Sequence, residues 1–282
     1  MVAYRPTLAP LFVPANRPDR IAKAVRSGTD AIIVDLEDSV PPSEKDAARH
    51  GLSDYLADCP VPVWLRINAC GTLWWEQDLE AARALPLAGL MLPKAEYPVN
   101  VPLLASQKGS TLPIILLIET ARGLANIAAI CAVPHIAQLA FGSVDFALDL
   151  GCAHERDALL LARSAMVFQS RLAGLPPPLD GVTTKIADLT VLSGDCRHAC
   201  ALGFGGKMAI HPTQISTIRS AFLPSETEIR WAERVIEADA QRGGKATQVD
   251  GQMIDKPMVE RARQILVKSR QFMFLESNLF DK

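Results

Sequence analysis

Short, continuously apolar segments alternate along this chain with longer stretches in which apolar residues recur at helical spacing. Segments such as Ile-Ile-Val at 32–34 and Ile-Ile-Leu-Leu-Ile at 114–118 contain no alternating polar residues. Strands that are buried on both faces have this continuous pattern, whereas a sheet with one solvated face alternates apolar and polar residues. The pattern therefore predicts parallel strands that are covered by helices.

Eight segments fit strands, and helical stretches follow them. The predicted strands are Leu11–Val13, Ala31–Leu36, Val63–Ile67, Leu87–Leu92, Ile114–Ile118, Ile136–Phe141, Leu179–Val182 and Lys207–Ile210. The predicted helices are Pro18–Ser27, Ser43–Ala57, Trp75–Leu85, Val101–Gln107, Ala121–Ile130, Glu155–Ala173, Ala187–Leu202 and Thr213–Ala221. Eight such units in about 220 residues fit an α/β fold of the TIM (β/α)8 barrel type. A doubly wound open sheet is the alternative, since periodicity does not determine closure.

The chain continues for about 60 residues beyond the eighth unit, which is more than a barrel requires. Ser225 followed by Glu228 forms a capping box, which predicts a helix that runs to about Gln241. A glycine-containing break at 243–251 precedes a last helix at about Lys256–Gln271. We therefore expect a barrel at residues 1–222 and a C-terminal helical extension at 223–282.

Composition narrows the class of protein. Of 282 residues, 49% are hydrophobic and 21% are charged, which supports a large core. The formal net charge of −2 and the aromatic content of 6% do not indicate a nucleic-acid-binding surface. The sequence lacks the pattern of a signal peptide and an apolar run of membrane-spanning length, and its six cysteines have no paired spacing. We expect a cytoplasmic protein that binds neither nucleic acid nor membrane.

Polar residues follow most of the predicted strands. In a TIM barrel, catalytic residues emerge at the carboxyl ends of the strands. Carboxylates predominate among the residues there, and single cations follow two neighbouring strands. This distribution suits a hard divalent cation, which prefers oxygen ligands. In chain order, the residues are Asp35, Glu37, Asp38, Arg66, Asn68, Lys94, Glu119, Thr120, Asp145 and His211.

Each main candidate also has a structural interpretation. Glu119 and Asp145 could cap the helices that follow them, but two carboxylates on adjacent strands favour a metal site. Asp35 and Glu37 are spaced to share one face, and burying both requires a cation or a base. Arg66 lies among apolar neighbours and suits bidentate recognition of a substrate carboxylate. An ion pair of Arg66 with Asp35 or Glu37 is the alternative.

Eight ordered motifs extend over nearly the whole chain. They are LFVPANRPDR at 11–20, DAIIVDLEDSV at 30–40, LRIN at 65–68, MLPK at 91–94, LIETA at 117–121, FGSVD at 141–145, GKMAIHP at 206–212 and DGQMIDKP at 250–257. Together they resemble the citrate lyase beta-subunit-like branch of the HpcH/HpaI aldolase family. The motifs are specific to this family and much less specific to one substrate.

The resemblance implies a barrel that binds Mg²⁺, or Mn²⁺ in its place, and cleaves or forms a carbon–carbon bond beside a CoA thioester. The leading substrate is (S)-citramalyl-CoA, which would give acetyl-CoA and the α-keto acid pyruvate. Alternatives are a malyl-CoA or β-methylmalyl-CoA lyase or thioesterase, and the citryl-thioester lyase subunit of a complex with carrier-protein partners. A non-catalytic member of a complex that binds CoA or a keto acid is an alternative of a different class.

The resemblance also implies roles for individual residues. Asp35 and Glu37 would support catalysis by accepting hydrogen bonds from metal-bound waters. Asp255 in the last motif would enter a neighbouring subunit's site as an acid/base, which implies a homo-oligomer, a trimer or a multiple of three. A pure binding module would not need this acid. The implied metal ligands are Glu119 and Asp145, and the implied substrate contacts are Arg66, Glu119, Lys94 and Gly142.

Overall fold

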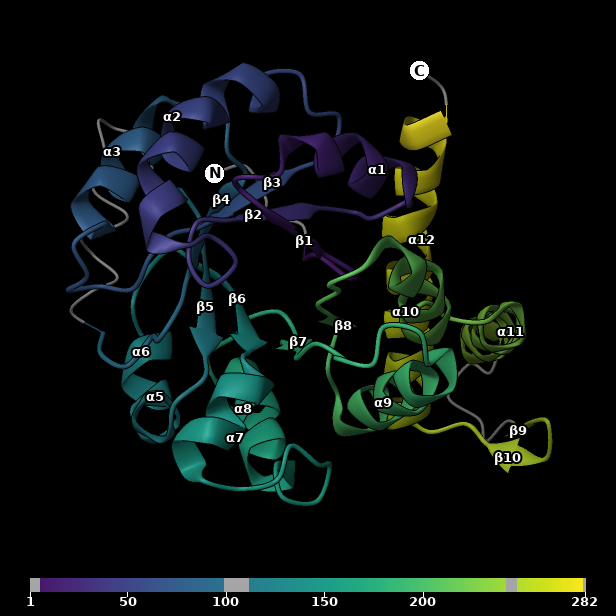
Figure 1. Cartoon of the computed structure of the whole chain (residues 1–282). Coiled ribbons are helices and arrows are strands. Elements are labelled where there is room, and N and C mark those ends of the chain that lie inside the picture. Colours follow the sequence, from purple (N-terminus) through teal and green to yellow (C-terminus); the bar gives the residue numbers. More distant parts are fainter. Residues whose placement is uncertain (1–5, 99–111, 242–247, 281–282) are drawn as a thin grey trace. The chain divides into compact units, whose positions relative to one another are not determined.

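The computed structural model describes residues 6–98, 112–241 and 248–280. Contacts within the chain divide it into two compact units, Met1–Arg219 and Ser220–Lys282. The first unit contains a parallel sheet and its helices, and the second contains the C-terminal helices (Figure 1). None of the helices within the described ranges has both the length and the apolarity needed to cross a bilayer.

In the described part of the first unit, eight parallel strands form one sheet in the order β1 to β8. Their bounds are β1 Leu11–Pro14, β2 Ile32–Asp35, β3 Val63–Arg66, β4 Gly89–Leu92, β5 Ile114–Ile118, β6 Ile136–Phe141, β7 Leu179–Asp180 and β8 Gly206–Lys207. The backbone N–H of Phe12 donates to the Ala209 carbonyl, and the N–H of Ala209 donates to the Pro10 carbonyl, both at 2.9 Å. These bonds join the first strand to the eighth segment, so the predicted (β/α)8 barrel is confirmed and the open sheet is wrong.

Helices follow the strands of the barrel. They are α1 Ile21–Arg26, α2 Lys45–Leu56, α3 Trp75–Ala84, α5 Ala121–Ala125, α6 Ile127–Cys131, α7 Ser143–Leu150, α8 Leu160–Leu172, α9 Leu189–Leu202 and α10 Ile215–Phe222. Short 3-10 turns at Pro18–Arg20, Pro42–Glu44 and Pro212–Gln214 precede α1, α2 and α10. Each of these turns begins with a proline, which has no N–H to donate and therefore suits the first turn of a helix.

Some predicted helix bounds differ from the structure. The predicted Ala121–Ile130 helix is divided at Asn126, whose side chain donates to the Glu96 carbonyl at 2.9 Å. Residues 155–159 form turns before α8, and here Arg156 pairs with Asp195 at 2.9 Å. The predicted Val101–Gln107 helix lies outside the described residues.

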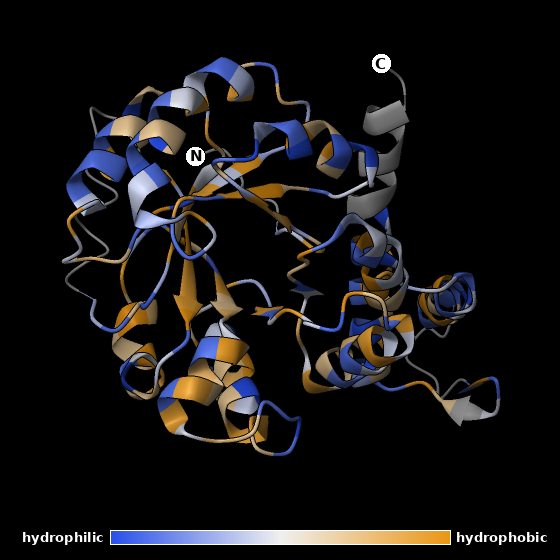
Figure 2. Cartoon of the chain, viewed as in Figure 1, coloured by the Kyte–Doolittle hydropathy of each residue, from blue (hydrophilic) through white to orange (hydrophobic). Residues whose placement is uncertain are grey.

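The barrel interior is filled by apolar side chains from the strands, which Figure 2 shows as mainly hydrophobic segments. Gly89 makes room for the buried Trp64, because a Cβ at this position would lie 2.3 Å from the indole ring. The apolar core cluster consists of Ala31, Ile33, Trp64, Met91, Ile115, Leu117, Ala137, Ala140, Leu179 and Met208.

The second unit contains α11 Glu226–Gln241, the hairpin strands β9 Gln248–Val249 and β10 Gln252–Met253, and α12 Lys256–Phe280. The predicted capping box is confirmed, since the N–H of Ser225 donates to Glu228 at 2.8 Å and the N–H of Glu228 donates to the Ser225 hydroxyl at 3.2 Å. β9 lies within the break predicted at 243–251 and β10 directly after it, and residues 243–247 of that break lie outside the described residues. α12 continues beyond the predicted end at Gln271. The small core of this unit contains Ala232, Val235, Val249, Ile254, Val259 and Ala262.

Candidate active site at the carboxyl ends of the strands

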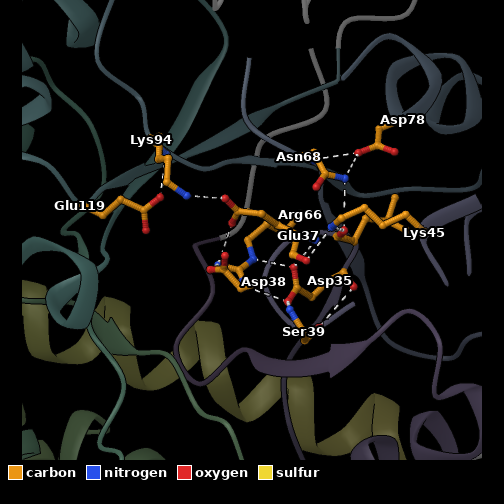
Figure 3. A network of polar contacts seen from close by, with 11 residues as sticks. Asp35, Glu37, Asp38, Ser39, Lys45, Arg66, Asn68, Asp78, Lys94 and Glu119 are labelled. Atoms are coloured by element: carbon orange, nitrogen blue, oxygen red, sulfur yellow. Dashed lines mark hydrogen bonds and ion pairs between the residues drawn. The ribbon is translucent and has the colours of Figure 1, made fainter. Parts of the chain in front are cut away.

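Arg66, the last residue of β3, is the centre of a buried ion-pair cluster (Figure 3). The register of β2 and β3 places Asp35 opposite Arg66, and the guanidinium donates from Nε and Nη2 to the two Asp35 oxygens at 2.6 and 2.7 Å. Its Nη1 lies 3.1 Å from Glu37 Oε2 and 3.3 Å from Asp38 Oδ2. The ion-pair alternative for Arg66 is therefore the one that the structure shows. Asp35 and Glu37 share one site, as their spacing predicted.

The ion pair controls the protonation of its members. Burial works to raise the pKa of Asp35, but the charge and hydrogen bonds of Arg66 hold that pKa below its usual value. Burial likewise opposes the charge on Arg66, and Asp35 and Glu37 outweigh it and raise the pKa of the guanidinium. Asp35 and Arg66 are thus both charged at neutral pH, and Asp35 fixes the plane of the guanidinium.

A second chain of contacts joins Glu37 to Glu119 through Lys94, as Figure 3 shows. The ammonium group of Lys94 donates to Glu37 Oε1 at 2.8 Å, and its backbone N–H donates to Glu119 Oε1 at 2.7 Å. Lys94 has a φ of 46°, a left-handed conformation that is uncommon for a residue with a side chain. Such strain concentrates at functional sites, and here it accompanies the contact of the backbone N–H with Glu119.

Glu119, which follows β5, is a buried carboxyl group with an unsatisfied oxygen. Its exposed fraction is 1%, and its Oε2 has no hydrogen-bond partner among the described residues. Burial, and then the proximity of Glu37, raises the pKa of Glu119 to about 8. A carboxyl group in this state is stabilised in its charged form by any cation that reaches it.

Gly142 allows the close approach of β6 to Glu119. A Cβ at Gly142 would lie 2.4 Å from the Glu119 Cβ and 2.5 Å from Oε2, so no larger residue fits without displacing the carboxylate. The same glycine precedes α7, which carries Asp145 in its first turn. The F-G-S-V-D motif thus places a second carboxylate after the strand that neighbours Glu119.

These residues surround a cavity of about 750 Å³. Seven of the predicted residues line it, namely Asp35, Asp38, Arg66, Glu119, Gly142, Asp145 and His211. Glu37 and Lys94 reach the site through their contacts with Arg66 and Glu119. Apolar side chains such as Phe12 and Met208 line another part of the cavity, and Arg17, Arg20 and Lys23 add positive charge to its lining.

The carboxyl groups of the site fit a divalent cation. The carboxyl groups of Asp35, Glu37, Asp38 and Glu119 outnumber the two cations Arg66 and Lys94, and Asp145 adds a fifth carboxyl group. Across the described ranges, no three His, Cys, Asp or Glu side chains are grouped so that they could hold a metal on their own. Mg²⁺ usually takes one or two carboxylates and completes its shell with water and substrate, so this donor set fits Mg²⁺.

Residues outside the strand ends support the site. Lys45 on α2 donates from its ammonium to the carbonyls of Leu36 and Glu37 at 2.7 and 2.8 Å. The side chain of Asn68 donates to the Leu36 carbonyl at 3.1 Å and to Asp78 on α3 at 2.6 Å. Asn68 was a strand-end candidate, but Lys45 and Asp78 were missed because they lie within helices. The one sequence signal for them is a charged residue on the apolar face of each helix.

Asp255 belongs to the second unit. Its carboxylate accepts a hydrogen bond from the N–H of Met258 at 2.9 Å, and it is solvent-exposed at the start of α12. An N-terminal cap is a sufficient structural reason for an aspartate here. The role of Asp255 in the site of another copy stays a prediction.

The fold and site together are those of a TIM-barrel protein whose carboxylates suit a divalent cation. Residues 8–212 match the family model described as HpcH/HpaI aldolase/citrate lyase, so the chain belongs to this family. It is 38% identical over 270 residues to a citrate lyase subunit beta-like protein of Mycobacterium tuberculosis, covering 91% of this chain and 93% of that protein. It is 33% identical over 289 residues to the human mitochondrial citramalyl-CoA lyase, covering 92% and 84% of the two chains.

A solved structure extends the comparison. The CitE protein of M. tuberculosis in complex with magnesium, acetoacetate and coenzyme A matches with a TM-score of 0.82 and 35% sequence identity. The match covers 95% of this chain and all of that one. The family membership expected from the eight motifs is therefore confirmed.

Proposed function

We propose that this protein is a Mg²⁺-dependent carbon–carbon lyase that cleaves a hydroxyacyl-CoA thioester, with (S)-citramalyl-CoA giving acetyl-CoA and pyruvate. The observation that carries the proposal is the buried carboxyl group of Glu119, whose Oε2 has no hydrogen-bond partner among the described residues. Glu119 and Asp145 line the same cavity. The likeness to citramalyl-CoA lyase and to a structure holding magnesium, acetoacetate and coenzyme A supports the same activity.

Glu119 and Asp145 would hold the metal, with Mn²⁺ able to replace Mg²⁺. When bound, the metal supplies Lewis-acid chemistry that lowers the pKa of the substrate hydroxyl. Gly142 gives Glu119 the space to bind, and the N–H of Lys94 keeps one Glu119 oxygen in place. Two carboxylates are the number that Mg²⁺ commonly takes from a protein.

The chain's own residues would carry the remaining steps. The substrate hydroxyl would give its proton to solvent and become the carbonyl of the keto acid, while the electron pair of the broken carbon–carbon bond would pass to the acetyl-CoA fragment as an enolate. Arg66 stabilises the negative charge on the thioester oxygen, and Asp35 and Glu37 hold the guanidinium in place for this contact. One proton then reaches the enolate carbon to give acetyl-CoA, so protons balance over the cycle.

Asp255 of a neighbouring copy is the proposed donor of that proton. The proposal includes a homo-oligomer, a trimer or a multiple of three, in which the C-terminal extension of one copy completes the site of another. Acyl-CoA thioesters and α-keto acids are the proposed small-molecule partners, and the cytoplasm is the proposed location.

The test is a release assay with the purified full-length protein, Mg²⁺ and racemic citramalyl-CoA. A coupled dehydrogenase follows pyruvate, and malyl-CoA and citryl-CoA are assayed in parallel. We expect pyruvate release that EDTA abolishes and slow turnover of malyl-CoA. Faster turnover of malyl-CoA than of citramalyl-CoA would identify malyl-CoA as the substrate. No turnover of any of the three thioesters would contradict the proposed function.

A further inference from the structure

A second buried charge cluster lies at the carboxyl ends of β7 and β8. Asp180, the last residue of β7, accepts from Arg163 Nε at 2.9 Å and from Lys207 Nζ at 2.8 Å. The Lys207 ammonium also donates to the Gly181 carbonyl. The side chains of Asp180 and Lys207 are 2% exposed, and that of Arg163 is 8% exposed. This cluster was not predicted, and the proposed lyase reaction does not use it.

The cluster contains more positive than negative charge. Burial works to raise the pKa of Asp180, but Lys207 and Arg163 hold that pKa below its usual value, so the carboxylate is charged. Two buried cations then face one buried carboxylate, and a buried charge without a compensating partner is unfavourable. Arg163 Nη1 is buried and has no hydrogen-bond acceptor among the described residues. The guanidinium therefore has a free donor in a region that is short of negative charge.

This cluster borders a second cavity of about 460 Å³, lined by Arg163, Lys207, His154 and neighbouring residues. Asp195 also lines the cavity, but Arg156 pairs with it at 2.9 Å and the Thr183 hydroxyl donates to it at 2.8 Å. The other two lining carboxylates, at 155 and 157, are solvent-exposed and therefore screened by water and salt. The buried side of the cavity is thus cationic.

The imidazole of His154 provides a second indication that the buried side of this cavity is positively charged. Burial, and then the charges of Arg163 and Lys207, lowers the pKa of His154. The ring lies 2.9 Å from the hydroxyl of Ser143, which lines the active-site cavity. Val182 lines both cavities, so the second cavity adjoins the first.

We propose that the second cavity binds a small oxyanion, a phosphate or a carboxylate group, with Arg163 and Lys207 as its cationic contacts. A guanidinium with a free N–H beside an ammonium group makes short, charge-assisted hydrogen bonds to such an anion. The anion would neutralise the excess buried charge of the cluster. This inference goes beyond the proposed lyase activity and does not depend on it.

The test uses histidine NMR signals of the full-length protein, because the chain has only five histidines. Inorganic phosphate and, in a separate series, acetate replace chloride at constant pH and ionic strength. The variant His154→Gln assigns the His154 signal. We expect a saturable shift of this signal, while the signal of His211, which lines the active-site cavity, does not follow the same curve. If phosphate binds more tightly than acetate, the natural ligand group is a phosphate, and if acetate binds more tightly, it is a carboxylate.

Thr184 provides matched variants at the exposed edge of the cavity. Thr184→Asp adds a negative charge there, whereas Thr184→Asn has nearly the same size and no charge. We expect Thr184→Asp to weaken anion binding by about tenfold or more and Thr184→Asn to leave it unchanged. The proposal is overturned if neither anion gives a saturable His154 shift, if Thr184→Asp binds as tightly as Thr184→Asn, or if His211 shifts with the same curve.

Discussion

Two clusters of charged side chains lie at the carboxyl ends of the strands of this barrel, and they differ in which kind of side chain is in the majority. The cluster after strands β2 to β5 has Arg66 and Lys94 among Asp35, Glu37, Asp38 and Glu119. The cluster at β7 and β8 has Arg163 and Lys207 on Asp180 alone. The first has an unpartnered carboxyl oxygen and the second an unpartnered guanidinium nitrogen.

The comparison teaches that the group left without a partner, rather than the number of ion pairs, is the feature from which we infer a ligand. Buried polar atoms without partners are rare in folded proteins, so each one requires an explanation. The partner that we propose for Glu119 is a cation, and the partner that we propose for Arg163 is an anion. We therefore propose that two adjoining cavities at the carboxyl ends of the strands bind ligands of opposite charge.

The largest effect is expected for Glu119→Gln. The amide cannot supply the charge that holds Mg²⁺, so Mg²⁺-dependent turnover should be lost and Mg²⁺ should no longer raise the melting temperature. Glu80→Gln on α3 is the control, because Glu80 contacts Arg83 at the surface. Turnover by Glu119→Gln at the wild-type rate would exclude Glu119 as a ligand.

Replacement of Asp255 should lower the lyase rate by about 10²–10⁴-fold, the usual contribution of general acid–base catalysis, and leave Mg²⁺ affinity unchanged. Asp255→Asn retains a capping oxygen for the N–H of Met258, so it separates catalysis from helix capping. Hybrid oligomers of Asp255→Asn and Glu119→Gln subunits should regain activity, since intact sites would form between copies. Full activity of Asp255→Asn would remove this residue from the mechanism.

The two clusters should respond differently to the loss of a carboxylate. Asp180→Asn leaves Arg163 and Lys207 without their shared anion, and breaking a buried ion pair in this way costs about 3–5 kcal/mol of folding free energy. Asp35→Asn should cost less, because Glu37 and Asp38 remain near Arg66. Urea unfolding followed by circular dichroism measures both, and equal losses would contradict the charge asymmetry.

Gly142→Ala should weaken Mg²⁺ binding by about 10–100-fold, the range seen when groups that orient a metal ligand are changed. The added Cβ would meet Glu119 at about the Cβ and Oε2 positions and displace the carboxylate. Calorimetric titration with Mg²⁺ measures the loss. Gly151→Ala at the end of helix α7 is the control for backbone strain. An alanine there is strained at the φ of 70°, but its Cβ contacts no neighbour, so Mg²⁺ binding should not change.

The smallest effect is the pH dependence of Mg²⁺ binding. Folding raises the pKa of Glu119 from 4.5 to about 8, so the metal-free site holds a proton at neutral pH. The stability that this proton provides is complete below the unfolded pKa and is lost as the pH rises through about 8. Mg²⁺ affinity should therefore increase by up to about tenfold per pH unit until about pH 8 and then level. Titrations of the wild type and Glu119→Gln check this, and a flat wild-type profile would contradict it.

Strand-end positions could be predicted well where strands were long and poorly where they were short. β5 has the predicted bounds, so Glu119 was found directly after it. β7 and β8 have two residues each, and their predicted ends at Val182 and Ile210 lie beyond Asp180 and Lys207. Asp180 was therefore assigned to the interior of its strand and Lys207 to the start of its strand, whereas each is the last residue of its strand. A two-residue strand has no periodicity of its own, and its bounds follow from pairing with its neighbours.

The sequence by itself determined the longer apolar strands, the capping box at Ser225 and the carboxylates after those strands, because these depend on residues close together in the chain. The tertiary structure decided that β1 meets the β8 segment, that Asp35 occupies the fork of Arg66, and that Arg163 shares Asp180 with Lys207. Register between distant segments sets which charges meet, and burial sets which of them need a partner. Neither quantity can be calculated from local spacing.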